Sequence, residues 1–432
     1  MHINVELRDL ERSIRNFVIE GSFLQVVYSL LGVTIISAYL ATAGASPMVI
    51  SILVSIPFFT TAAQIISAKF VERKNRKRIA IFASLVSKMA LLALTLNAFI
   101  DGMYEILIFA IFYFIFNVCE DVYTVTSNSW ARDLIPAGKR GEVLSKRSAY
   151  GRILAIPALF IQIFVFEKFQ REGFPLLFLT ATVFGIIAIL FLRNVENVKC
   201  NRISEPRITE PLRNPSFLIL VLIAVLLFFS QSSARTFFAV YLLTLGYPLY
   251  TILFLAFVAH ISSIYALRFS GSFSDRFGNK PLFSLSCISF IISAVIFAIS
   301  SRESLQILIF AYILYGFYIS APTIAIANAV ADLTYKKHSA PYYAIINWIS
   351  DISSALGSIF AGFLLDSLYS HGDFAFRFLF LISAAISVLP IIATSLYDEF
   401  SPPQIFTIFK APTLVIEDIL SVLKVSIRKK TL

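Results

Sequence analysis

Several side chains that can carry charge or a proton lie within long apolar stretches of the sequence. Glu120 and Asp121 are adjacent in one stretch, Lys88 is near the centre of another, and Arg235 lies in a third. An ionised group at mid-depth of a bilayer costs about 2.5 to 3.5 kcal/mol, so it needs a partner or water. We therefore expect these four residues to mark the functional site.

The neighbouring acids Glu120 and Asp121 cannot point the same way, because consecutive helical residues project about 100° apart. Only one of them can face a common interior site squarely, and the other can meet Lys88. Burial penalises the charged form of a carboxylate, so either acid has the chemistry to take up and release a proton. A structural ion pair of Lys88 with one of the two acids is the alternative interpretation.

A polar residue lies one helical turn from the acid pair, and another lies one turn from Arg235. Asn117 lies one turn before the two acids, and Gln231 lies one turn before Arg235. Arg235 has the chemistry to bind an anion or a carboxylate, and pairing with a carbonyl group or snorkelling is the alternative. Tyr315 is the middle residue of a three-residue repeat, which can stack on an aromatic or sugar-like solute or fill the seam between helices.

Four other residues inside apolar stretches are predicted to have structural roles. Gly357 and Gly362 are typical of close helix packing, and His260 on an apolar helix is expected to be a packing residue. Glu20, near one end of the first stretch, is expected to lie at the membrane interface.

The elements that position these residues follow from composition. Hydrophobic residues make up 58% of the chain, charged residues only 14%, and the mean hydropathy is +0.81. One soluble core cannot hide so much apolar surface, so most of the chain must lie in lipid. Apolar runs of about 20 residues, the length that crosses a bilayer, lie near 16–44, 47–69, 79–100, 105–129, 148–168, 175–193, 216–245, 248–270, 282–300, 304–331, 341–369 and 374–396. The sequence predicts an all-α integral membrane protein with twelve transmembrane helices in two six-helix bundles.

The net charge of +10 has a location that argues against a nucleic-acid partner. When the loops are assigned alternately to two sides, thirty of the 36 Lys and Arg residues fall on one side, including those at 69–78 and 132–152. This asymmetry is the positive-inside pattern. We therefore expect a multi-pass protein of the plasma membrane with both termini in the cytosol.

Nothing in the sequence points to a cofactor, a metal or an enzyme. The three cysteines and four histidines are scattered and lack the spacing of a metal site. No phosphate-binding Gly-x-x-x-x-Gly-Lys-Ser/Thr motif occurs, so ATP is not expected to drive the protein.

The chain divides at a polar, proline-containing linker. We predict an N-terminal bundle at 1–193, a linker at 194–215, a C-terminal bundle at 216–396, and a cytosolic tail at 397–432 with an amphipathic helix. The stretch 128–134 resembles 328–333 with a one-residue gap, which indicates that the two bundles are repeats.

The decapeptide 271–280 combines an acid, two glycines and two cations in a short loop between two apolar runs, and 68–78 is a weaker copy. We predict that the two loops form a latch between the bundles that exists in one conformational state and breaks in the other. A simple topology anchor on the cytosolic side is the alternative. The latch residues are Gly271, Asp275, Arg276, Gly278, Lys280, Glu72, Arg73 and Arg76.

These features resemble the major facilitator superfamily from about residue 15 to residue 396. The loop 271–280, the stretch 133–141 after the fourth apolar run, and the entry 44–47 to the second run are similar to motifs of that family. The loop 68–78 departs from the motif at Ala68, Glu72 and Asn75. The resemblance implies a central cavity lined by spans one, four, seven and ten, which would place Glu120, Asp121 and Arg235 in contact with solute or a proton.

We therefore predict a secondary active transporter that moves a small solute by alternating access, with proton coupling, as a monomer in the lipid bilayer. A gradient-independent facilitator of an organic anion or sugar-like solute is the alternative, and a non-transporting receptor is a third. Export of the solute is one of the two directions of transport that the sequence allows. Of the proline-glycine signature of similar drug exporters, span five keeps only Pro157.

Overall fold

The computed structural model describes residues 2–64, 67, 75–100, 103–135, 140–196, 211–334 and 340–397, and every regular element in these ranges is helical. The first half contains α1 (His2–Leu30), α2 (Val33–Thr42), α3 (Pro47–Thr60), α5 (Arg76–Asn97), α6 (Met103–Leu134), α7 (Arg140–Phe169), the 3-10 turn η2 (Gln170–Glu172) and α8 (Gly173–Arg193). The second half contains η3 (Pro211–Arg213), α9 (Pro215–Arg235), α10 (Phe238–Thr244), α11 (Leu249–Phe277), α12 (Asn279–Ile299), α13 (Leu305–Leu333), α14 (Ala340–Ser367), η4 (Tyr369–His371), α15 (Asp373–Ile386) and α16 (Val388–Ser395).

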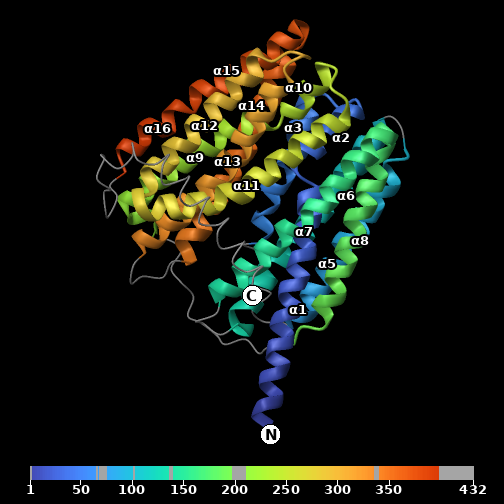
Figure 1. Cartoon of the computed structure of the whole chain (residues 1–432), viewed down its shortest axis with the longest axis vertical. Coiled ribbons are helices and arrows are strands. Elements are labelled where there is room, and N and C mark those ends of the chain that lie inside the picture. Colours follow the sequence, from blue (N-terminus) through green and yellow to red (C-terminus); the bar gives the residue numbers. More distant parts are fainter. Residues whose placement is uncertain are drawn as a thin grey trace, which may run out of the picture.

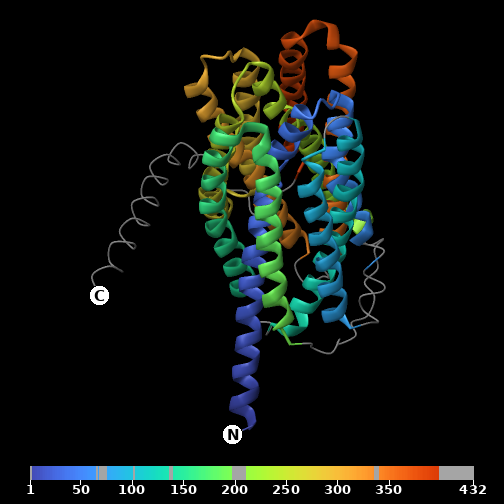
Figure 2. The same ribbon diagram turned by 90° about the vertical axis from the view of Figure 1, so that its right-hand side faces the viewer.

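The predicted all-helical membrane architecture is confirmed. Ten helical stretches of the described residues are long and apolar enough to cross a bilayer, and the bent pair of α1 and α2 makes eleven. The stretch 143–193 holds both α7 and α8, which turn back on each other at η2 (Figure 2). Counting α7 and α8 separately gives the twelve crossings that the sequence predicts.

Three of the predicted spans are broken rather than continuous. The axis bends by 41° between α1 and α2, where Gly32 has an extended backbone. The seventh span breaks at Thr236 and Phe237 between α9 and α10, and the last breaks at Ser387 between α15 and α16. Each break lies at a local feature of the sequence. These features are Gly32, the polar run 230–236, and Pro390, which cannot donate a helical hydrogen bond to the carbonyl of Ile386 where α15 ends.

The helices form two groups, which we call the N group (α1 to α8) and the C group (α9 to α16). The ends at which α1 and α5 begin and α8 and α11 end carry the basic loops, and we call this side the basic face. In Figure 1 the two groups meet at their other ends, where α2, α3 and α10 lie, and point apart toward the basic face.

Two helix pairs join the groups. On one side α3 packs against α14 so closely that a Cβ atom on Gly362 would lie 2.1 Å from the Ser51 hydroxyl, and Ser55 donates a hydrogen bond to the Ala355 carbonyl at 3.3 Å. On the other side α7 meets α11, where Arg152 donates to the Ser263 hydroxyl at 3.2 Å. These contacts form the seam between the groups.

The residues predicted to have packing roles behave as expected. A Cβ atom on Gly357 would lie 2.3 Å from the Phe229 carbonyl oxygen, so this glycine lets α14 approach α9. Nε2 of His260 lies 3.1 Å from the Arg152 carbonyl oxygen and contributes to the seam.

The turn of the loop 271–280 is shorter than the sequence suggests. α11 continues through Gly271 to Phe277, and only Gly278 has a positive φ, of 87°. The Gly278 N–H donates to the Ser274 carbonyl at 2.8 Å, which closes the helix end. A Cβ atom on Gly271 would meet nothing within 4 Å, so no neighbouring helix among the described residues approaches closely at this glycine.

The two helical glycines provide a matched test of the seam. We expect Gly362→Ala to destabilise the protein by about 1 to 3 kcal/mol, because the added methyl group overpacks α3 against α14. Gly271→Ala should be neutral or stabilising by about 0.5 to 1 kcal/mol, because its site is open and helical. Thermal unfolding in detergent measures both, and equal shifts would show that the seam is not tightly packed.

Candidate functional site

A buried ion pair joins α5 to α6 in the N group. Lys88 Nζ lies 2.5 Å from Glu120 Oε1, and the two side chains are 3% and 7% exposed. The Ser87 hydroxyl donates to the same oxygen at 2.6 Å. The ion-pair interpretation of Lys88 is therefore correct, with Glu120 as its partner.

The surroundings of this pair are shaped to hold it. A Cβ atom on Gly185 of α8 would lie 2.5 Å from Lys88 Cε, so the glycine makes room for the lysine stem. The second oxygen of Glu120 accepts a hydrogen bond from the Tyr28 hydroxyl of α1 at 2.6 Å. Both carboxylate oxygens are thus satisfied, which offsets the cost of burying the charge.

A second ion pair lies nearer the basic face, between α1 and α7. Arg147 Nη2 lies 2.8 Å from Glu20 Oε2, and the Glu20 side chain is 1% exposed. The Tyr123 hydroxyl donates to Glu20 and accepts from Arg147 Nη2 at 2.9 Å. A Cβ atom on Gly21 would overlap the Arg147 side chain, so only glycine leaves space for this arginine.

This second pair corrects two expectations. Glu20 is buried rather than interfacial, and Arg147 belongs to a helix rather than to the predicted loop 132–152. The reason is that α7 begins at Arg140, two turns before the apolar run begins at 148. The Arg147 guanidinium also lies over the Phe17 ring at 4.3 Å, an environment that a solvated loop charge would not have.

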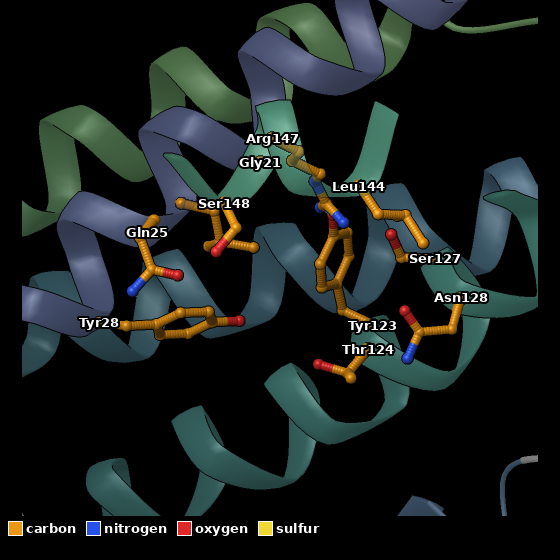
Figure 3. A pocket seen from close by; sticks show the side chains of 11 residues that line it. Gly21, Gln25, Tyr28, Tyr123, Thr124, Ser127, Asn128, Leu144, Arg147 and Ser148 are labelled. Atoms are coloured by element: carbon orange, nitrogen blue, oxygen red, sulfur yellow. The ribbon is translucent and has the colours of Figure 1, made fainter. Parts of the chain in front are cut away.

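A pocket of about 210 Å³ lies beside the two ion pairs, lined by residues of α1, α6 and α7 (Figure 3). The rings of Tyr28 and Tyr123 line it, while their hydroxyls bond Glu120 and Glu20. Gln25 and Asn128 also face it (Figure 3). Each tyrosine thus connects the pocket to one buried carboxylate.

Asp121 points away from Glu120, as the helical geometry requires. Gln64, which follows α3, donates to Asp121 Oδ1 at 2.7 Å. No lysine or arginine among the described residues pairs with it. Asp351 of α14 is near enough for the charges of the two acids to act on each other. Asp121 is therefore a half-buried acid near the seam.

Three other predicted site residues make their described contacts within their own group of helices. Asn117 donates to the Tyr113 carbonyl of its own helix at 2.7 Å. Gln231 donates to the Ser286 hydroxyl at 3.4 Å. Tyr315 is only 7% exposed and packs against its neighbours Tyr312 and Tyr318, so the tyrosine stripe largely fills the C group.

Arg235 is placed differently from the other intramembrane cations. It is the last residue of α9, at the break in the seventh span, and its charge acts on the phenols of Tyr315 and Tyr318. Its Nε is buried without a hydrogen bond, and no acid in the described ranges forms an ion pair with it. The guanidinium is therefore available to a ligand.

The predicted latch residues are only partly described. Glu72 and Arg73 lie outside the described residues. Arg76 is buried and donates to the Ser129 carbonyl at 3.1 Å, within the N group. Asp275 is exposed and has no hydrogen bond to any described residue.

The C-group loop is tied down within its own group. Asn279 donates to Asp332 Oδ2 at 3.2 Å, and the Ser274 hydroxyl donates to Asn279 Oδ1 at 2.6 Å. Arg276 is exposed and Lys280 is half-buried at this end of the C group. The described contacts of the loop lie within the C group, as expected when the groups point apart on this face.

Sequence reasoning missed Tyr28, Tyr123 and Arg147, which complete the polar cluster. One signal was available: Glu20 and Arg147 are opposite charges at the basic ends of spans that the resemblance places in the same bundle. The tyrosines gave no signal, because 18 tyrosines are spread over the chain.

The Lys88–Glu120 pair can be tested by removing one partner or both. Lys88→Met should destabilise the protein by about 3 to 5 kcal/mol, because it leaves Glu120 buried without a cation. Adding Glu120→Gln should restore much of this loss. Thermal unfolding in detergent measures both variants, with the exposed Lys168→Met as the control. Wild-type stability of Lys88→Met would show that the pair does not hold α5 to α6.

Comparisons with known proteins agree with this architecture. A family model described as Major Facilitator Superfamily matches residues 21–301 and 261–425. No curated protein sequence matches the chain.

Several solved structures share its fold. The nucleoside transporter NupG aligns with a TM-score of 0.72 at 15% identity, covering 90% of this chain and 100% of that one. The xylose transporter XylE from E. coli, in a partially occluded inward-open conformation, aligns with 0.66 at 13% identity, covering 90% and 98%. A bacterial homologue of the lysosomal transporter Spinster, inward-facing and unoccupied, aligns with 0.64 at 16% identity, covering 90% and 96%. The chain therefore belongs to the Major Facilitator Superfamily and is a multi-pass membrane transporter, not an enzyme.

Proposed function

We propose that this protein is a proton-coupled secondary transporter of a small solute, and that Asp121 carries the proton. The observation that carries the proposal is the contrast between two adjacent acids. Glu120 has a lysine and two hydroxyl donors, whereas Asp121 has one described donor, the neutral amide of Gln64, and lies within the electrostatic range of Asp351.

The two environments favour different protonation behaviour. Glu120 is committed to Lys88 and to the hydroxyls of Ser87 and Tyr28, so it suits a structural role. A carboxylate that is partly desolvated and lies near a second acid gains more from taking up a proton. Asp121 also bonds the residues that follow α3, a helix of the seam, so its protonation acts where the groups move against each other.

Alternating access would follow from the arrangement of the two groups. They meet away from the basic face, and we place the basic face in the cytosol of a plasma-membrane protein because positive loops face inward. The likeness to inward-facing structures of other transporters supports a conformation open to the cytosol. We retain the monomer as the functional unit.

The loops 68–78 and 271–280 would form the latch when the basic face closes. Asp275 is exposed in the present conformation, so it is free to bond the N group on closure. We expect Asp275→Asn to favour the open conformation by about 1 to 3 kcal/mol. Accessibility of a cysteine at Asn128 to a membrane-impermeant thiol reagent, added from the basic face, should rise in this variant. Unchanged accessibility would favour the topology anchor.

A gradient-independent facilitator of an organic anion is the second candidate. Arg235 favours it, because a cation without an ion-pair partner in a membrane span is suited to an anionic ligand. In this case transport would depend on Arg235 and hardly on pH.

Proteoliposome uptake under an imposed pH gradient separates the two candidates. Asp121→Asn should abolish accumulation above equilibrium while exchange of solute across the membrane continues, because binding survives and coupling is lost. Arg235→Gln should leave the pH dependence unchanged. If Asp121→Asn accumulates solute as wild type does, or if Arg235→Gln ends binding and pH has no effect, proton coupling through Asp121 is contradicted.

A further inference from the structure

The pocket of Figure 3 has features that define the class of solute it can accept. Its volume of about 210 Å³ is below the roughly 300 to 1,000 Å³ of pockets for drug-sized ligands, so the solute is small. Tyr28 is 37% exposed, which makes it an available aromatic residue. Tyr123 also borders the pocket but is only 1% exposed.

The pocket presents no net charge. Arg147 is the charged residue of the lining, and Glu20 neutralises it at 2.8 Å. Behind Tyr28, Glu120 is neutralised by Lys88 at 2.5 Å. A charged solute would lose hydration on entry without gaining a free counter-ion, which is costly in a partly desolvated site.

Uncommitted polar groups surround the rings. Ser127 is 1% exposed, and its hydroxyl lies near the Tyr123 phenol without the geometry of a hydrogen bond to any described residue. A buried hydroxyl without a partner is costly, so a ligand or water is expected to bond it. The amide of Gln25 and the hydroxyl of Thr124, also in the lining, have no described hydrogen bond.

From these observations we propose that the N-group pocket binds an uncharged solute that carries several hydroxyl or amide groups on a ring. The ring lies against Tyr28, and its polar groups bond Ser127, Gln25 and Thr124. The inference rests on the proposed transport function and assigns its solute class. It excludes the organic anion of the second candidate from this pocket.

The direct test compares uncharged solutes with their charged counterparts. Purified protein in detergent is heated with uridine or uridine 5′-monophosphate, and with D-galactose or D-galacturonate, each at millimolar concentration. A bound solute raises the melting temperature. We expect at least one uncharged solute to raise it and its charged counterpart to have no effect.

Variants then locate the binding. Ser127→Ala and Gln25→Leu should each weaken the affinity for that solute roughly three- to tenfold, the value of one hydrogen bond. Ser289→Ala is the control, because the Ser289 hydroxyl bonds its own helix backbone in the C group, at Leu285. The variants' melting temperatures without solute show whether they remain folded.

Any of three results would overturn the inference. The first is that neither uncharged solute stabilises the protein, and the second is that a charged counterpart stabilises it more strongly. The third result is that the Ser127→Ala, Gln25→Leu and Ser289→Ala variants all bind the solute with the same affinity. The binding assay uses no gradient, so a failure of proton coupling would leave its outcome unaffected. A failure of this inference would likewise leave coupling through Asp121 in place.

Discussion

A charge inside an apolar bundle must be neutralised, and this constraint shapes the whole N group. Two buried acids, Glu20 and Glu120, each bind one cation from another helix and one tyrosine hydroxyl. These contacts involve five of the six N-group crossings. Four of them contribute a polar side chain, and α8 contributes Gly185, which leaves room for Lys88. The ion pairs therefore hold the N group together and shape its pocket.

This internal satisfaction has a consequence for motion. Polar groups that are bonded within one group need not break when the groups move, so the N group can rock as a unit. The seam is different, because it depends on close packing at Gly362 and on a few hydrogen bonds such as that of Arg152 to Ser263. Asp121 of α6 accepts a hydrogen bond from Gln64, which follows α3 of the seam, and this is where we propose that an added or removed charge changes the balance between conformations.

Much of the fold could be predicted from the sequence, because the length of an apolar run and the side of its flanking charges are local properties. The twelve crossings follow from them. A pair of Lys88 with one of the two adjacent acids is an alternative interpretation of the sequence, and the structure identifies Glu120 as the partner. The breaks at Gly32, Thr236 and Ser387 were not predicted, because an apolar run long enough to cross a bilayer indicates one continuous helix, although Gly32, the polar residues 230–236 and Pro390 accompany the breaks.

The pocket itself was also beyond the sequence. It depends on α7 beginning at Arg140 and on Gly21 leaving space for Arg147, which are properties of packing between distant segments. Charge counting assigned Arg147 to a loop because it lies just before an apolar run. A residue at such a boundary is placed by its partner, here Glu20, and not by its neighbours in the chain.

Two rigid groups that rock about the seam must change the distances across the two faces in opposite directions. Spin labels in lipid measure these distances, with label pairs at Arg193 and Arg268 for the basic face and at Tyr104 and Glu303 for the opposite face. On closure of the basic face, we predict that the first distance shortens and the second lengthens. The distance between Arg78 and Arg193, both in the N group, should stay constant. The account is contradicted if the last distance changes as much as the first, or if both inter-group distances change in the same direction.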